Sequence, residues 1–211
     1  MDIDARRYKS PALCIVDMQN DFVRAGAPLE VADARATFAT HLRLIAAFRR
    51  IGAPVIYTKF VATPEPSLLW RWSPQCAPPT LCCRKGHLRT YGDAAGMLEC
   101  TDIVAEIYPA PGDMIVEKYG YGAFHGTRLS DHLRQSGVAS LVVTGTVTQI
   151  CVEETARAAF HHGFATTLVS DAVSSFAPDL HAATLKNFAM KFGWVENAAA
   201  VAQAIGTTGA G

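Results

Sequence analysis

The sequence lacks a net charge. Nineteen Lys and Arg residues balance nineteen Asp and Glu residues among 211 positions. A chain without an excess of basic residues, and without a block of like charge, offers no electrostatic field to the phosphates of a nucleic acid or to an anionic membrane surface. We therefore expect no nucleic-acid partner and no membrane partner, and a small, weakly charged molecule as the ligand.

Long apolar runs are also missing. No stretch approaches the roughly 20 consecutive apolar residues of a membrane-spanning helix, and residues 1–19 contain no long apolar segment followed by a small-residue cleavage site. These absences favour a cytoplasmic protein. Hydrophobic residues nevertheless make up 50% of the chain, and its length fits one large domain, residues 1–211, better than two.

No CxxC pair occurs among the cysteines. The six cysteines are Cys14, Cys76, Cys82, Cys83, Cys100 and Cys151. In a chain of this size without a secretory signal, free thiols are expected rather than a disulfide framework. One candidate zinc site is the group formed by the loop cysteines at 76, 82 and 83 and His87. Adjacent cysteines rarely ligate one zinc ion, so we expect no metal and no other cofactor.

Short runs rich in β-branched residues alternate with amphipathic stretches. The expected strands are Ala12–Val16, Pro54–Thr58, Met114–Glu117, Leu141–Thr144 and Ala165–Val169. The expected helices are Ala34–Ile51, Thr127–Ser136, Gln149–His162, Leu180–Phe192 and Glu196–Ile205. Strands joined by crossover helices predict an α/β fold with a parallel, doubly wound sheet that is covered on both faces.

The segment 61–112 breaks this alternation. It contains seven prolines, two tryptophans and four of the six cysteines, with one short possible helix at 102–107. Long irregular segments inside compact domains usually act as lids or binding loops. We interpret the segment as an irregular insertion that covers a pocket or contacts another subunit.

The segment 141–155 joins a β-type run to a helical pattern. The apolar run breaks at Gly145, and the helical pattern carries Cys151 in its first turn. With Thr148 as the N-cap, Cys151 is the third helical residue, and the positive end of the helix dipole favours its thiolate. A buried cysteine acting as a small hydrophobe is the commoner alternative. The position of Cys151 at a strand–helix junction adds a second hypothesis, in which Cys151 is a catalytic nucleophile.

Two further apolar strands end in a reactive group. Asp17 follows one expected strand and Lys118 follows another, and parallel strands deliver such ends to one edge of the sheet. There Cys151 can attack an acyl group, Asp17 can take and return a proton, and Lys118 can favour the thiolate. Taken alone, Asp17 also fits a turn or helix cap, and Lys118 fits an ordinary surface cation.

Three sequence blocks surround these residues: IVDMQNDF at 15–22, EKYGYGAF at 117–124 and TGTVTQICVEETAR at 144–157. In order and spacing they resemble the signature blocks of the isochorismatase-like cysteine hydrolases. The resemblance implies a Rossmann-like, three-layer fold with a mainly parallel six-stranded sheet. It also implies a catalytic triad of Asp17, Lys118 and Cys151.

The same resemblance implies a cis peptide bond between Thr146 and Val147. In the family, such a bond turns a backbone N–H toward the substrate. The N–H groups of Val147 and Cys151 would then form the oxyanion hole. Members of the family commonly assemble, so the resemblance also implies a homodimer or a homotetramer.

Two absences narrow the expected reaction. Nicotinamidases of this fold bind a metal through an aspartate and two histidines after the second strand, whereas residues 57–66 here contain no histidine. True isochorismatases lack the nucleophilic cysteine, which this chain keeps. A finer similarity to ureidoacrylate and N-carbamoyl amidohydrolases lies in SDA at 170–172 and NFAMKFGWV at 187–195.

The expected function is therefore a metal-independent cysteine amidohydrolase that cleaves a small amide or ureido compound through a thioester. Loop residues expected to contact the substrate are Phe22, Trp70, Arg89, Tyr121, His125 and Gln149. Arg89 fits a carboxylate partner or, equally, a solvated loop arginine. Alternatives are a nicotinamidase-like or maleamate-like amidase, a different use of the thiolate in redox or isonitrile chemistry, and a non-catalytic binding or scaffold protein.

Overall fold

A six-stranded parallel sheet forms the centre of the computed structural model, which describes residues 3–208. The ends of the predicted domain, residues 1–2 and 209–211, lie outside the described residues. The strand order is β5-β2-β1-β6-β7-β8, and each neighbouring pair is parallel. The strands are β1 (Pro11–Val16), β2 (Val55–Phe60), β5 (Met114–Lys118), β6 (Ser140–Thr146), β7 (Ala165–Ser174) and β8 (Trp194–Glu196). The predicted doubly wound α/β fold is confirmed.

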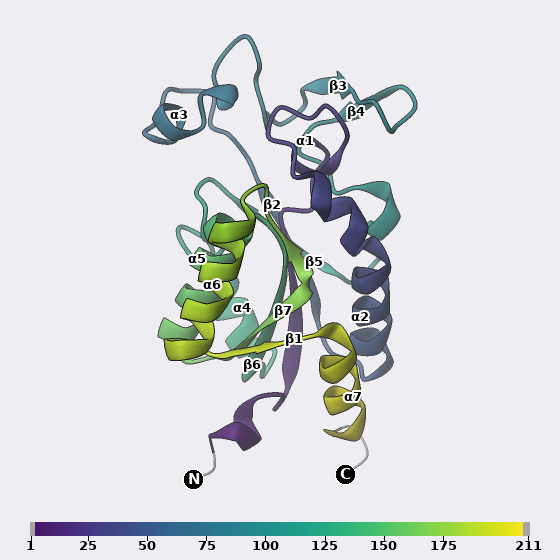
Figure 1. Ribbon diagram of the computed structural model, residues 1–211, viewed down its shortest axis with the longest axis vertical. Helices are drawn as coiled ribbons and strands as arrows, with labels where there is room; N and C mark the ends of the chain where they lie inside the picture. Colours follow the sequence, from purple (N-terminus) through teal and green to yellow (C-terminus); the bar gives the residue numbers. More distant parts are fainter. Residues whose placement is uncertain (1–2, 209–211) are drawn as a thin grey trace.

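Helices cover both faces of the sheet (Figure 1). Helices α2 (Phe38–Arg50) and α7 (Ala198–Thr208) lie on one face, and α4 (Leu129–Gln135), α5 (Glu153–His161) and α6 (Pro178–Lys191) lie on the other. All five expected helices are present, with ends shifted by a few residues. The first expected helix is divided, because a 3-10 helix at Ala32–Thr37 precedes α2.

The central strand β1 shows why the sheet needs both layers. All six of its side chains are buried. Leu13 and Ile15 pack with the α2 and α7 side, while Cys14 and Val16 pack with the α4, α5 and α6 side. Alternate residues of a strand point to opposite faces, so an uninterrupted apolar run buries fully only between two layers.

The carboxyl ends of the strands point toward a third group of elements, at the top of Figure 1. This group contains α1 (Asn20–Val23), α3 (Leu69–Trp72) and the antiparallel hairpin β3 (Leu88–Thr90) and β4 (Met97–Glu99). The segment 61–112 therefore has only short regular elements, including 3-10 helices at Pro74–Cys76 and Ala105–Ile107. The last of these lies within the short helix expected at 102–107.

The strand order reverses direction between β1 and β6. From β1 the chain proceeds outward through β2 to β5, whereas β6, β7 and β8 extend the sheet on the other side. In open α/β sheets, ligands bind in the crevice at this switch point, beyond the carboxyl ends of the strands. The fold thus marks the top of β1 and β6 as the place to look for a site.

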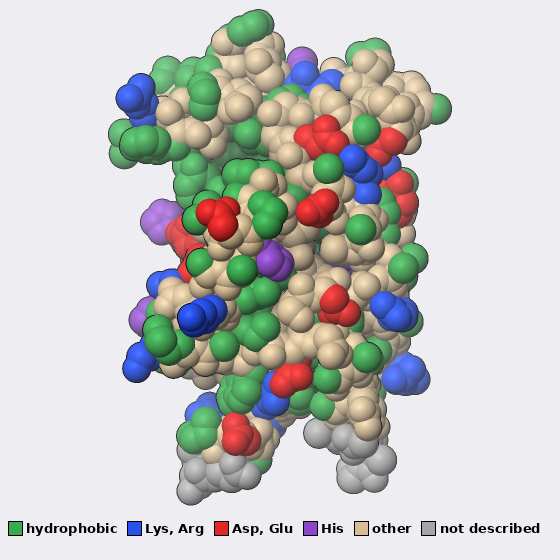
Figure 2. Space-filling view, in the orientation of Figure 1, with side chains coloured by type: hydrophobic (Ala, Val, Ile, Leu, Met, Phe, Trp, Pro, Cys, Tyr) green, Lys and Arg blue, Asp and Glu red, His purple; other side chains and the backbone are tan. Residues whose placement is uncertain are grey.

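The surface carries interspersed charges of both signs, as Figure 2 shows for one face. Apolar side chains gather over the α3 region, where Leu68 is 88% and Trp72 is 75% exposed. Within the described part of the chain, no helix has the length and apolar character required to cross a membrane.

Gly145 allows β6 to approach β1 at their carboxyl ends. Its φ is +104°, and a Cβ there would lie 2.1 Å from the Val16 carbonyl oxygen. A side chain at this position would push apart the two strands that carry Asp17 and lead to Cys151. Glycine is therefore required for both its backbone conformation and the close approach.

We expect Gly145→Ala to lower the free energy of unfolding by at least about 3 kcal/mol, because the new methyl group overlaps backbone atoms. Gly163→Ala is the matched control. Gly163 also has a positive φ, +86°, but an added Cβ meets nothing within 4 Å, so only about 1–2 kcal/mol of backbone strain is expected. Urea unfolding measures both, and equal losses would contradict the steric argument.

Candidate active site

Asp17 follows β1 and is held by Thr58, at the end of the neighbouring β2. The Thr58 hydroxyl donates to Asp17 Oδ1 at 2.6 Å, and the Asp17 backbone N–H lies 3.2 Å from the same hydroxyl oxygen. Asp17 has a φ of +50°, a region that L-residues seldom adopt. Thr58 therefore orients both the backbone and the carboxylate of Asp17.

Lys118 is the last residue of β5 and forms an ion pair with Asp17. Its Nζ lies 2.7 Å from Asp17 Oδ2 and donates to the Gly120 carbonyl at 3.1 Å. Both side chains of the pair are 0% exposed. The ammonium also lies over the Phe60 ring, 5.5 Å from its centroid. The structure thus brings together two of the predicted strand-end residues without any contact with solvent.

Burial acts to lower the pKa of Lys118, but the Asp17 carboxylate and the Cys151 sulfur outweigh this effect, so the pKa is raised. Lys118 is therefore a cation at neutral pH. It places a fixed positive charge against the Asp17 carboxylate and the Cys151 sulfur.

Cys151 lies beyond β6, and its sulfur interacts electrostatically with both Lys118 and Asp17. It belongs to a π-helical turn, Thr148–Val152, that continues directly into α5. The expectation that Thr148 is the N-cap is wrong. Its hydroxyl donates to the Ser174 carbonyl at 3.0 Å and contacts His181 Nδ1 at 2.9 Å, so it bonds to β7 and α6 instead of to the first helical turn. Cys151 is the fourth residue of the helical stretch.

Burial raises the pKa of the Cys151 thiol well above its ordinary value of 9.0. Lys118 acts in the opposite direction and does not outweigh burial, and Asp17 adds to the rise. The expectation of a preformed thiolate is therefore wrong for the free protein. At 4% exposure the sulfur has little water to solvate a negative charge, so the resting group is a thiol beside a carboxylate.

A cavity of about 280 Å³ opens above the sulfur. The residues that line it are Phe22, Pro28, Leu29, Glu30, Phe60, Trp72, Ser73, Tyr121, Val147, Ile150, Cys151 and Phe176. Val147 and Cys151, the two residues of the expected oxyanion hole, line the same cavity. The peptide bond between Thr146 and Val147 is cis, as predicted.

The expected substrate contacts divide into two groups. Phe22 and Tyr121 line the cavity. Trp70 does not, because it is partly buried against the hydrophobic core, and Trp72 from the same short helix takes the place at the wall. In a helix of one turn, residues two apart face different directions, which the sequence pattern did not resolve.

Three other expected contacts lie outside the cavity. Arg89 Nε donates to Asp21 Oδ1 at 3.0 Å, and its guanidinium also donates to the Thr80 carbonyl at 2.5 Å, so it holds a loop. His125 is exposed on the loop before α4. Gln149 accepts from the Ser175 hydroxyl at 2.7 Å and lines a neighbouring groove.

Sequence reasoning missed several residues of the site. The most consequential are Thr58, which binds Asp17, and Phe60, which packs under the Lys118 ammonium. Thr58 is the last residue of the expected second strand and Phe60 lies two residues beyond it, next to the strand that delivers Asp17, and that adjacency was the available signal. Glu30, Ile150 and Phe176 carried no comparable signal.

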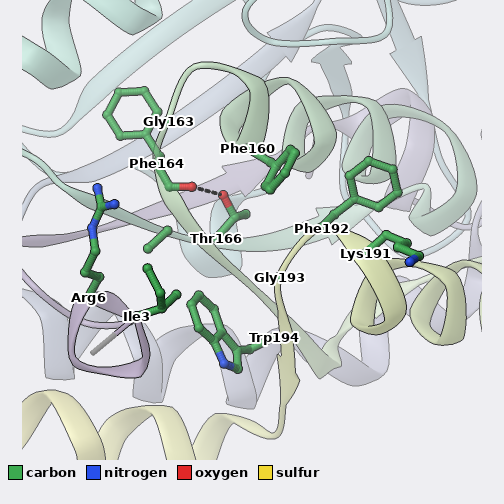
Figure 3. Close-up of a pocket in the computed structure, with 11 residues that line it drawn as sticks. Ile3, Arg6, Phe160, Gly163, Phe164, Thr166, Lys191, Phe192, Gly193 and Trp194 are labelled. Atoms are coloured by element: carbon green, nitrogen blue, oxygen red, sulfur yellow. Dashed lines mark hydrogen bonds between the residues drawn. The ribbon is translucent and has the colours of Figure 1, made fainter. Parts of the chain in front are cut away.

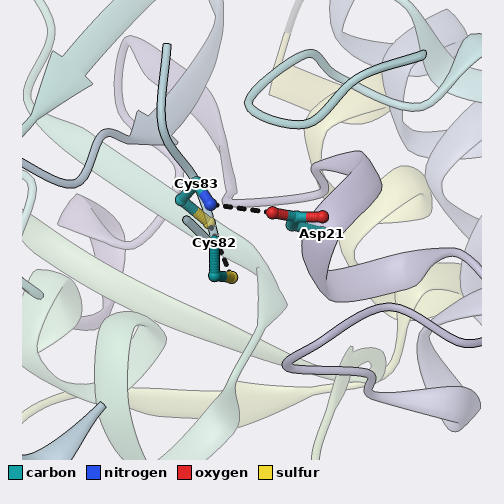
Figure 4. A group of neighbouring side chains, drawn as sticks. All are labelled: Asp21, Cys82 and Cys83. Atoms are coloured by element: carbon teal, nitrogen blue, oxygen red, sulfur yellow. Dashed lines mark hydrogen bonds between the residues drawn. The ribbon is translucent and has the colours of Figure 1, made fainter. Parts of the chain in front are cut away.

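A second buried cluster lies around Asp21 in α1 (Figure 4). Potential metal-ligand atoms of Asp21, Cys82 and Cys83 lie within 4.8 Å of one another. Asp21 Oδ2 accepts the Cys83 N–H at 2.7 Å, and Oδ1 accepts from Arg89 and, at 2.7 Å, from the Tyr91 hydroxyl. Burial raises the pKa of the Cys83 thiol well above its ordinary value. The carboxylate is occupied by protein donors, and we assign no metal here.

A larger cavity, of about 370 Å³, lies elsewhere on the molecule and shares no lining residue with the cavity above Cys151. Figure 3 shows the rings of Phe160, Phe192 and Trp194 among its lining residues, with Arg6 and Lys191 on opposite sides. It contains none of the three strand-end residues.

Comparison with known proteins agrees with this geometry. Residues 11–200 match the isochorismatase domain family. The chain is 32% identical over 206 residues to the ureidoacrylate amidohydrolase RutB of Methylobacterium radiotolerans, covering 92% of this chain and 79% of that protein. It is also 32% identical over 192 residues to Nicotinamidase 3 of Arabidopsis thaliana, covering 89% and 84% of the two chains.

Among solved structures, the N-carbamoylsarcosine amidase of Thermoplasma acidophilum is similar, with a TM-score of 0.70, 29% identity, and coverage of 89% of this chain and 96% of that chain. The chain therefore belongs to the isochorismatase family. Within that family it is an amidohydrolase, an enzyme acting on carbon–nitrogen bonds other than peptide bonds.

The raised pKa of Cys151 predicts how the thiol reacts with iodoacetamide. Because the thiolate fraction is small below pH 9, we expect the alkylation rate to rise continuously through pH 9 and to be slower at pH 7 than that of a free thiol. Mass spectrometry of the modified peptide measures the rate. A plateau near pH 7 would indicate a preformed thiolate and contradict this interpretation.

Thr58→Val removes the hydroxyl that orients Asp17. We expect kcat for ammonia release to fall by about tenfold or more, since a misplaced carboxylate loses part of its general-base contribution. Thr58→Ser keeps the hydroxyl and is expected to retain most of the activity. Wild-type turnover by the valine variant, with its melting temperature unchanged, would show that Asp17 needs no such support.

Proposed function

We propose that this protein is a metal-independent cysteine amidohydrolase that cleaves the C–N bond of a small amide or ureido compound, with water as the second substrate. The observation that carries the proposal is the buried Asp17–Lys118 ion pair, 2.7 Å long, next to the only cysteine that lines the cavity within residues 3–208. Nucleophile, base and charge-stabilising cation are then all supplied by the chain.

The first step of the proposed reaction forms a thioester. As the Cys151 sulfur attacks the substrate carbonyl, its proton passes to Asp17. Proton transfer coupled to attack fits a thiol whose pKa is raised by burial, because the charge then forms on the substrate oxygen and not on an isolated sulfur. The N–H groups of Val147 and Cys151 would donate hydrogen bonds to that oxygen and so form the oxyanion hole.

The second half of the reaction returns the site to its starting state. Protonated Asp17 gives its proton to the leaving nitrogen, and ammonia or an amine departs as the C–N bond breaks. Asp17 then takes a proton from a water molecule that attacks the thioester, and it gives this proton to the Cys151 sulfur as the C–S bond breaks and the acid product leaves. Lys118 stays charged throughout and stabilises Asp17 whenever it is a carboxylate.

The names of the relatives support an amide or ureido substrate, and the residues around the end of β2 support a metal-independent site. The curated relatives are named as a ureidoacrylate amidohydrolase and a nicotinamidase, and the structural relative as an N-carbamoylsarcosine amidase. Residues 57–66, which include the end of β2 and the loop after it, contain no histidine. This chain therefore lacks the metal-binding pattern expected of a metal-dependent nicotinamidase.

The cellular setting and assembly of the enzyme are part of the proposal. All six cysteines are free and buried, which suits a reducing compartment such as the cytoplasm. We propose a homodimer or homotetramer on the basis of the family resemblance. Light scattering of the purified protein measures the assembly, and a monomer at micromolar concentration would contradict this part.

We expect Cys151→Ala to abolish ammonia release while leaving the fold intact, because the nucleophile is lost and a small side chain fits the same position. Cys151→Ser is expected to be nearly as inactive, since a hydroxyl is much less acidic than a thiol. Mass spectrometry of the wild-type enzyme with a slow amide should detect an acyl adduct on Cys151. A fully active alanine variant would refute the mechanism. Cys14, also buried, provides the control, since Cys14→Ala should retain turnover.

A further inference from the structure

We propose that the enzyme selects uncharged amides or ureas with an aromatic or branched apolar group, and that it discriminates against substrates bearing a free carboxylate. This inference rests on the proposed function and narrows its substrate class. It differs from what the names of two relatives indicate, since ureidoacrylate and N-carbamoylsarcosine are both acids. The inference follows from the residues that line the cavity.

The wall above Cys151 is mainly aromatic and aliphatic. Rings from Phe22, Phe60, Trp72, Tyr121 and Phe176 line it, together with Pro28, Leu29, Val147 and Ile150. At about 280 Å³ the cavity lies at the lower end of the range for ligand pockets. A small apolar or aromatic group would bury most of its surface here, which is favourable in proportion to the area removed from water.

No cation in the wall is available for a carboxylate. Among the described residues that line the cavity, Glu30 is the one with a charged side chain. Its Oε2 accepts the Gly26 N–H at 2.8 Å, and its Oε1 pairs with Arg35 at 2.8 Å. The Gly26 N–H and then Arg35 hold the pKa of Glu30 below its ordinary value, so this group is an anion at neutral pH.

The cations near the site are bonded to other protein groups or lie outside the cavity wall. Lys118 is paired with Asp17 and bound to the Gly120 carbonyl. Arg89, the expected carboxylate partner, is bound to Asp21 outside the cavity. Arg35 divides its guanidinium between Glu30 and the Val23 carbonyl. Arg71 lies over the outer Trp72 ring, 5.8 Å from its centroid, and does not line the cavity.

A carboxylate in this cavity would therefore lose water without gaining an ionic partner, and it would face the Glu30 carboxylate. Burying an unpaired charge is strongly unfavourable. Neutral polar groups fare better, because the hydroxyls of Ser73 and Tyr121 lie 3.5 Å apart at the wall and each can donate or accept a hydrogen bond. The wall thus accommodates a neutral amide or urea.

Matched substrate pairs test the inference. Benzamide is compared with 4-carbamoylbenzoate, and the methyl ester of 3-ureidoacrylate is compared with 3-ureidoacrylate itself, with kcat/KM measured by ammonia release. We expect the neutral member of each pair to be favoured by at least about tenfold, since only the acid must bury an unpaired charge. Binding of the same compounds to Cys151→Ala, measured by calorimetry, reports the selectivity independently of turnover.

A gained charge should change the selectivity in a predictable direction. Ser73→Arg places a cation at the wall and is expected to raise kcat/KM for the acids relative to the neutral compounds. Ser67→Arg is the charge-matched control, because Ser67 is exposed and does not line the cavity. It should leave the ratio unchanged.

The outcomes separate the two proposals. Preference for the acids by the wild-type enzyme would overturn the inference while leaving the cysteine amidohydrolase intact, and loss of that preference in Arg71→Ala would identify the cation responsible. Absence of ammonia release from every compound would count against the proposed function. In that case, tighter binding of the neutral members to Cys151→Ala would still support the inference, and tighter binding of the acids would overturn it.

Discussion

The ion pair between Asp17 and Lys118 is the interaction on which the site depends. Two opposite charges lie 2.7 Å apart with no exposure to solvent, so each relies on the other and on a few protein dipoles. Removing one partner of such a pair typically costs about 3–5 kcal/mol, because the remaining charge is left uncompensated. The Thr58 hydroxyl, the Gly120 carbonyl and the Phe60 ring complete the surroundings. The ends of β1, β2 and β5 must therefore stay in register for the pair to exist.

The burial that makes this pair strong also determines the state of the nucleophile. In the same dry environment Cys151 is a thiol, since its pKa is raised by burial more than Lys118 lowers it. A thiol beside a carboxylate can react without forming a free thiolate first, provided that proton transfer accompanies attack. The mechanism and the apolar cavity thus follow from one property, the exclusion of water, which also makes an unpaired substrate charge unfavourable.

Asp21 is one of several residues that tie the segment 61–112 to the rest of the site. Asp21 accepts hydrogen bonds from Cys83, Arg89 and Tyr91, and so ties α1 to a long stretch of irregular chain. Trp72 and Ser73 of the same segment line the cavity. The hydrogen bond to Asp21 explains why Arg89, an expected substrate contact, holds a loop instead.

The sequence alone determined five of the six strands of the central sheet and the reactive residue at the end of three of them, and the resemblance of three motifs to a known family implied the triad and the cis peptide bond. These features are local, because they depend on apolar periodicity and on residues close together in the chain. Only the tertiary structure decided that Thr58 holds Asp17, that Trp72 and not Trp70 lines the cavity, and that Arg89 is paired with Asp21. It also reversed the expected ionisation of Cys151. Each of these features depends on contacts between side chains from distant segments of the chain. Those contacts form, and exclude water, only when the layers of the fold pack together.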